Sequence, residues 1–89
     1  MLKITKIQES KGDVLLKLEG KITEQWAALL DGECRSYLRQ KKTVHLDCSH
    51  VEYLDGRGVE VLNALPHSHV TLMSAPALVT ELLQIGGRS

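Results

Sequence analysis

The sequence predicts one α/β domain, residues 1–89, built on a single mixed β-sheet with helices packed on it. The apolar periods predict strand, strand, helix, strand, helix, strand and helix in turn, a β-β-α-β-α-β-α order. A polar turn joins the first two strands, whereas helices join the later ones, so the last strands should be parallel. The length of 89 residues suffices for one modest core but not for two.

Composition narrows the expected partners and compartment. The chain has 11 Lys and Arg against 11 Asp and Glu, which gives no electrostatic reason to expect nucleic acid or an anionic membrane as the main partner. The apolar runs are short and no signal peptide follows Met1, so we expect a cytoplasmic protein without direct membrane insertion. Cys34 and Cys48 fall at apolar positions with no CxxC pair, which favours free thiols over a disulfide or a zinc site.

The first two strands should form an antiparallel hairpin. Residues 2–7 and 14–19 each alternate apolar and polar side chains, and the polar segment 8–13 between them predicts the turn. Ile7 is out of register with the alternation, which indicates a bulge or the end of the strand. Gly20 is expected to close the second strand.

An amphipathic helix should follow, with Thr23 as its N-cap. Its apolar positions recur at a spacing of three to four, and Lys41 and Lys42 come after its last turn, near the negative end of the helix dipole. The positions expected to face the core are Trp26, Leu29, Leu30, Glu33/Cys34, Tyr37 and Leu38.

The third strand is predicted at residues 43–48, with a loop from Ser49 and a short helix beginning at Asp55. The Asp55 carboxylate can accept from amides two or three residues later, and its charge suits the positive end of the helix dipole. Pro66 should stop this helix. A fourth strand at residues 69–73 and a last helix capped by Ser74 complete the chain.

The start of the second helix is rich in glycine, with Gly56 and Gly58 on either side of Arg57. Glycine within a helix costs about 1 kcal/mol relative to alanine, so a bare backbone here needs a reason. Gly58 would allow either close helix-to-sheet packing or the approach of a partner's backbone. Arg57 would be well presented to a carboxylate or phosphate of a partner, and Tyr53 could anchor one.

Two arrangements that could suggest catalysis or metal binding have weak support. His45, Asp47, Ser49 and His50 contain the residue types of a Ser/His/Asp hydrolase, but no G-x-S-x-G elbow places the nucleophile. The histidines at 67 and 69 have no carboxylate or cysteine at matching spacing. We therefore expect no catalytic residues, no metal and no cofactor, and a protein that is not an enzyme.

The combined pattern resembles the STAS domain family, which is named after sulfate transporters and anti-sigma factor antagonists. The residues that carry the resemblance are a hairpin ending in Leu16, Leu18 and Gly20, then Val44 to Asp47, Val51 to Leu54, and Asp55, Gly56, Arg57, Gly58 and Val59. In family members regulated by phosphorylation, the acceptor Ser or Thr is the second residue after the Asp, which here is Arg57. The resemblance therefore implies a bacterial-type interaction module that is not switched by phosphorylation at this turn.

The resemblance also implies the kind of partner. The protein would act like an anti-sigma factor antagonist, bound to an anti-sigma-type regulator or kinase, or like the small STAS subunit of an ABC-type lipid transport system, bound to its ATPase. A nucleotide or small-anion site at the amides of the second helix is a further alternative, and a weak homodimer is compatible with the sequence. The expected partner-binding residues are Ser49, Tyr53, Asp55, Gly56, Arg57, Gly58 and Val59.

Overall fold

The computed structural model describes residues 1–87, with side chains of residues 1–83, and contains seven regular elements. In chain order they are β1 (Leu2–Glu9), β2 (Asp13–Ile22), α1 (Glu24–Arg39), β3 (Thr43–Leu54), α2 (Gly56–Ala64), β4 (Val70–Met73) and α3 (Ala77–Gly87). The predicted order of elements is confirmed.

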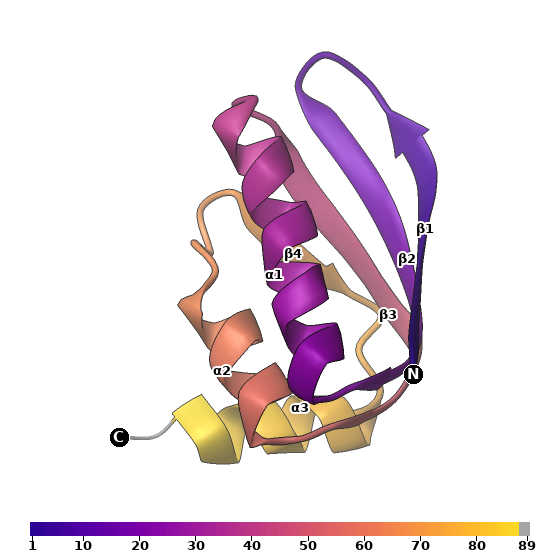
Figure 1. Ribbon diagram of the computed structural model, residues 1–89, viewed down its shortest axis with the longest axis vertical. Helices are drawn as coiled ribbons and strands as arrows, with labels where there is room; N and C mark the ends of the chain where they lie inside the picture. The colour runs from indigo at the N-terminus through magenta and orange to yellow at the C-terminus, as the bar shows by residue number, and fades with distance from the viewer. Residues whose placement is uncertain (88–89) are drawn as a thin grey trace.

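The strands form one four-stranded mixed sheet in the order β1-β2-β3-β4 (Figure 1). β1 pairs with β2 antiparallel, whereas β2 with β3 and β3 with β4 are parallel. The prediction of a mixed sheet with parallel last strands is therefore confirmed. Because β2 and β3 run in the same direction, the helices that follow them start at the same edge of the sheet.

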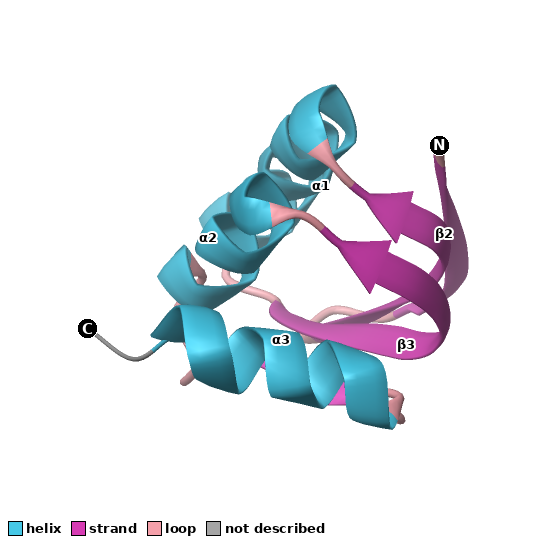
Figure 2. Cartoon of the chain, turned by 90° about the horizontal axis from the view of Figure 1, so that it is seen from below, coloured by secondary structure: helices cyan, strands magenta, loops and turns pink. Residues whose placement is uncertain are grey.

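The helices cover only one face of this sheet. Figure 2 shows α1 and α2 side by side against β2 and β3, and α3 lies across the lower end of the molecule in Figure 1, where it contacts α2 and β3. Every buried side chain among the described residues is apolar. The strand residues that point into this core are Leu2, Val14, Leu16, Leu18, Ile22, Val44, Leu46, Cys48, Val51, Leu54 and Val70.

The hairpin is longer than its alternation suggested. The pairing of β1 with β2 shifts between Lys6 and Gln8, so the bulge expected at Ile7 is confirmed. Gly20 does not close β2, because the strand continues to Ile22. Gly20 has φ +106°, and a Cβ there would overlap the carbonyl oxygen of Met1, so glycine is required inside the strand by geometry.

The third strand is also longer, and the loop expected from Ser49 is wrong. β3 continues to Leu54 with two shifts in its pairing with β2, at Lys17/Glu19 and at Gly20/Lys21. These irregularities interrupt the alternation of buried and exposed side chains. As a result, the neighbouring residues Ser49 and His50 are both exposed. The ends of β2 and β3 curl strongly, as Figure 2 shows.

The N-cap position predicted for α1 is confirmed, whereas the cap predicted for α3 is wrong. Thr23 occupies the N-cap position of α1, although its side chain makes no capping hydrogen bond. Ser74 has φ 55° and lies too far before Ala77, where α3 begins, to cap that helix.

The fourth strand begins at Val70, one residue later than predicted. Within residues 1–87, no helix combines the length and apolar character needed to cross a bilayer.

Candidate functional site

The candidate site lies where α1 and α2 begin. The parallel pairing of β2 with β3 ends at Ile22 and Leu54, which are register partners on these adjacent strands. Each strand runs almost directly into a helix, so Glu24 at the start of α1 and Gly56 at the start of α2 are brought together. The sheet register therefore joins two turns that are far apart in sequence.

Asp55 ties these two turns together with a single carboxylate. Its Oδ1 accepts from the backbone N–H of Gly58 at 2.8 Å, which is the N-cap bond predicted for α2. Its Oδ2 accepts from the backbone N–H of Glu24 at 3.0 Å, at the first residue of α1. The backbone N–H of Asp55 donates to the carbonyl of Ile22 at 3.3 Å. Asp55 thus accepts from the first backbone amide of α1, which has no partner within that helix.

The two glycines of the turn have different environments. Gly58 is buried, and a Cβ there would overlap the backbone carbonyl oxygen of Ile22, so this glycine permits the close approach of α2 to the end of β2. Gly56 is exposed and a Cβ there would meet nothing within 4 Å. Of the two explanations offered for Gly58, close packing is the one its surroundings match. Gly56 is the residue that leaves backbone open to solvent.

Arg57 is exposed beside a shallow depression between the two helix starts. This depression has a volume of about 330 Å³ and is lined by Arg57, Glu24, Gln25 and Ala28. Among the described side chains, no carboxylate lies within ion-pair distance of the Arg57 guanidinium. The α1 residues of this surface were absent from the sequence-based site, because no local pattern relates residues 24–28 to Arg57.

The other predicted site residues are spread along β3 and α2. Tyr53 is 44% exposed near the end of β3, while Val59 is buried in the core beneath the turn. Ser49 lies within β3 and is exposed. Of the predicted site residues, Tyr53, Gly56 and Arg57 are therefore exposed and close in sequence to Asp55. The buried residues Gly58 and Val59 pack under the turn.

Ser49 takes part in a local network with Asp47 and His50. The backbone N–H of Ser49 donates to Asp47 Oδ1 at 3.0 Å, and this bond together with the Ser49 side chain lowers the pKa of Asp47. Ser49 Oγ lies 3.0 Å from His50 Nδ1. Asp47 is thus bonded to the serine backbone and, within residues 1–87, makes no hydrogen bond to the imidazole, so the three residues do not form the relay of a hydrolase.

The described residues contain no group of three or more His, Cys, Asp or Glu side chains placed to hold a metal ion. Both cysteines are free and buried. Burial raises the pKa of the Cys34 thiol to about 12 and that of Cys48 to about 11. These thiols behave as core residues and are not part of the candidate site.

Comparisons with known proteins agree with this fold. A solved structure titled "Structure of the Anti-Sigma Factor Antagonist SpoIIAA in its Unphosphorylated Form" superposes with a TM-score of 0.72 at 10% sequence identity, covering 93% of this chain and 83% of that one. A search of curated proteins gives no match to the sequence. The STAS_2 family model, described as "Mlab, STAS domain", matches residues 5–88. Because this match spans nearly the whole chain, the chain belongs to the STAS domain family that this model describes.

Proposed function

We propose that this protein is a non-enzymatic regulatory module that binds another protein through the start of α2 and the adjoining end of β3. The observation that carries the proposal is the double cap of Asp55, which fixes the backbone of the turn from both helices. A turn held in this way loses little conformational entropy on binding. Gly56 and Arg57 then offer an open backbone and a guanidinium to the partner.

Binding through this turn is not switched by phosphorylation of the turn itself. Neither Gly56 nor Arg57 has a hydroxyl group, so the position at which related domains accept phosphate cannot be phosphorylated. A phosphate would bring a charge of about −1.5 to −2 to the helix start, whereas Arg57 brings a fixed +1. Arg57 suits a partner carboxylate, which a guanidinium can bind through two parallel hydrogen bonds.

Two classes of partner follow from the family resemblance. The first is an anti-sigma-type regulator or kinase, which the fold shared with an anti-sigma factor antagonist favours. The second is the ATPase of an ABC-type lipid transport system. The neighbouring coding sequence discriminates between them, because the two classes imply different complexes, and a cytoplasmic location remains the expectation for both.

The test is a binding titration against the purified regulator, kinase or ATPase encoded beside the gene. We expect wild-type protein to bind one of them, and Asp55→Lys and Arg57→Glu to weaken binding at least about tenfold while both variants remain folded. Lys11→Glu, in the distant hairpin turn, is the matched charge-reversal control. Unchanged binding by both folded site variants would show that the turn is not the interface.

The alternative of a nucleotide or small-anion site has its own measurement. Calorimetry of the wild-type protein against nucleotides should give no heat of specific binding. Incubation with the cognate kinase should likewise leave position 57 unmodified and binding unaffected. Loss of binding after phosphate enters Ser49 or another hydroxyl would overturn the claim that the module is constitutive.

A further inference from the structure

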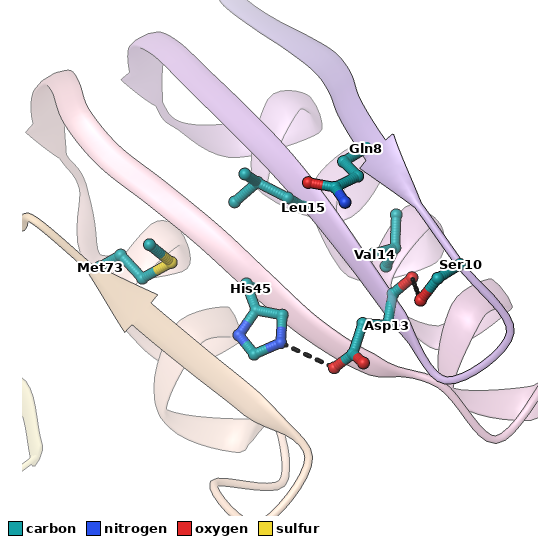
Figure 3. Close-up of a pocket in the computed structure, with 7 residues that line it drawn as sticks. All are labelled: Gln8, Ser10, Asp13, Val14, Leu15, His45 and Met73. Carbon is teal, nitrogen blue, oxygen red and sulfur yellow. Dashed lines mark hydrogen bonds and ion pairs between the residues drawn. The ribbon is translucent and has the colours of Figure 1, made fainter.

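A second cavity lies at the opposite end of β2 from the Asp55 turn, on the sheet face that the helices leave uncovered. Its volume is about 320 Å³, within the range of small-molecule sites. Figure 3 shows side chains from β1, β2, β3 and β4 and from the hairpin turn around it. Its lining includes Gln8, Ser10, Asp13, Leu15, His45 and Met73.

Asp13, His45 and Ser10 offer hydrogen-bond acceptors to this cavity, and the Gln8 amide offers both an acceptor oxygen and a donor NH2 group. His45 Nε2 lies 3.0 Å from Asp13 Oδ1, and because an ionised carboxylate only accepts, Nε2 must be the donor. In the neutral ring the other nitrogen, Nδ1, is then an acceptor, and Figure 3 shows it on the side towards Met73. Ser10 Oγ donates to the backbone carbonyl of Asp13 at 3.5 Å, which leaves its lone pairs as acceptors.

The formal charge of the lining is negative. Asp13 is the single carboxylate among the described lining residues, its side chain is 61% exposed, and no described residue donates a hydrogen bond to its second oxygen. The nearest lysine on the same face of β2 is Lys17, whose ammonium group lies 3.7 Å from Glu19. Asp47 on β3 is the register partner of Lys17 on β2 and of Met73 on β4, so its carboxylate also offsets the charge of Lys17. The cavity therefore favours a cation.

The remaining wall is apolar. Leu15 and Met73 lie on either side of His45 in Figure 3, and Met73 is 39% exposed although β4 is a strand of a parallel pair. Parallel strands are usually covered on both faces. The flexible Met73 side chain can adapt to apolar groups of different shapes in a ligand that also donates to His45 Nδ1.

We propose that this cavity binds a small organic cation, namely a primary amine or guanidinium attached to a compact apolar group. The cationic end donates to Asp13 and to His45 Nδ1, and the apolar group lies on Leu15 and Met73. Such a ligand supplies donors where the cavity supplies acceptors, and a positive charge where the lining is negative. The site is separate from the Asp55 turn and does not depend on the function proposed for it.

The test is an NMR titration of the ¹⁵N-labelled full chain with phenethylamine. We expect saturable shifts of the amides of residues 13–15, His45 and Met73. Two probes of similar size, 2-phenylethanol and 3-phenylpropionate, have a neutral or anionic end and should bind at least about tenfold more weakly. Equal affinity for the alcohol, or shifts centred elsewhere, would overturn the proposal, as would the absence of saturable shifts.

The matched variants are Asp13→Asn and Asp31→Asn. An amide at position 13 still accepts from His45 but lacks the charge, so this variant should weaken phenethylamine binding at least about tenfold. Asp31 lies on α1 in an exposed ion pair with Arg35, and its replacement should leave binding unchanged. The dispersion of each variant's spectrum reports that it is folded. Unchanged affinity in folded Asp13→Asn would contradict the assignment.

Discussion

The backbone amide of Glu24 donates to the carboxylate of Asp55 at 3.0 Å, across 31 residues of sequence. Glu24 has φ 45°, a left-handed conformation that non-glycine residues adopt only when their surroundings favour it. The bond to Asp55 stabilises that conformation, and the same side chain caps α2 through Gly58. One carboxylate therefore determines the geometry of two helix starts.

Replacing Asp55 with alanine should destabilise the fold by about 1–3 kcal/mol, because the change removes a cap from each of two helices. The free energy of unfolding measured in urea checks this value. Asp55→Asn should lose less, since an amide oxygen still accepts one of the two bonds. Asp31→Ala removes an exposed ion pair and should change stability by less than about 1 kcal/mol. Equal losses for Asp55→Ala and Asp31→Ala would contradict the double cap.

The two glycines beside Arg57 should respond in opposite directions to alanine. Gly58→Ala places a methyl group against the carbonyl oxygen of Ile22, which requires α2 to move, and should cost about 1–3 kcal/mol. Gly56→Ala meets nothing within 4 Å and should be neutral or stabilising by up to about 1 kcal/mol. Thermal unfolding of the two variants side by side measures the difference. Similar melting temperatures would show that Gly58 is not a packing residue.

The two central strands could be predicted because they carry a regular alternation over one buried face. Val14, Leu16 and Leu18 in β2 and the corresponding residues of β3 all point into the core, as the period of two requires. The Asp55 cap of α2 could be predicted for a similar reason, because its partner Gly58 lies only three residues away. Local chemistry was enough for these features.

The second half of β3 and the α1 side of the site could not be predicted in this way. Bulges in the β2–β3 pairing interrupt the alternation after Asp47, so Ser49 to Leu54 resembles a loop in sequence although it pairs as a strand. The bond from Glu24 to Asp55 depends on the parallel register that brings Ile22 next to Leu54. Only the tertiary structure relates residues so distant in the chain.

The thiols of Cys34 and Cys48 should react with a thiol reagent only when the protein unfolds. Both side chains are fully buried, and burial raises the pKa of Cys34 to about 12 and that of Cys48 to about 11, so almost no thiolate exists at neutral pH. Their rate of modification should rise with urea in parallel with global unfolding. Rapid modification of either thiol in the native protein would contradict the burial of both in one core.

Glu9 should make the fold sensitive to acid between about pH 4.5 and pH 2. Its carboxylate forms ion pairs with Lys42 and with Lys6. The hydrogen bond from Lys42 has the largest effect and that from Lys6 the next largest, and together they lower the pKa of Glu9 from 4.5 to about 2. A carboxylate with a lowered pKa in the folded state stabilises that state above its unfolded pKa. The contribution is lost as pH falls through the folded value. The ion pairs also connect the hairpin turn to the start of β3.

The measurement is the pH dependence of unfolding for wild-type protein and Glu9→Gln. The wild type should be the more stable of the two at neutral pH, and the difference should shrink below pH 4.5 and vanish only below pH 2, where the carboxyl of the folded wild type is protonated as well. High salt should reduce the difference, because both partners are near the surface. Glu52→Gln is the control, because Glu52 is an exposed β3 residue that forms no ion pair with any described side chain. A difference for Glu9→Gln that stayed constant from pH 7 to pH 2 would show that the ion pairs with Lys42 and Lys6 do not stabilise the fold.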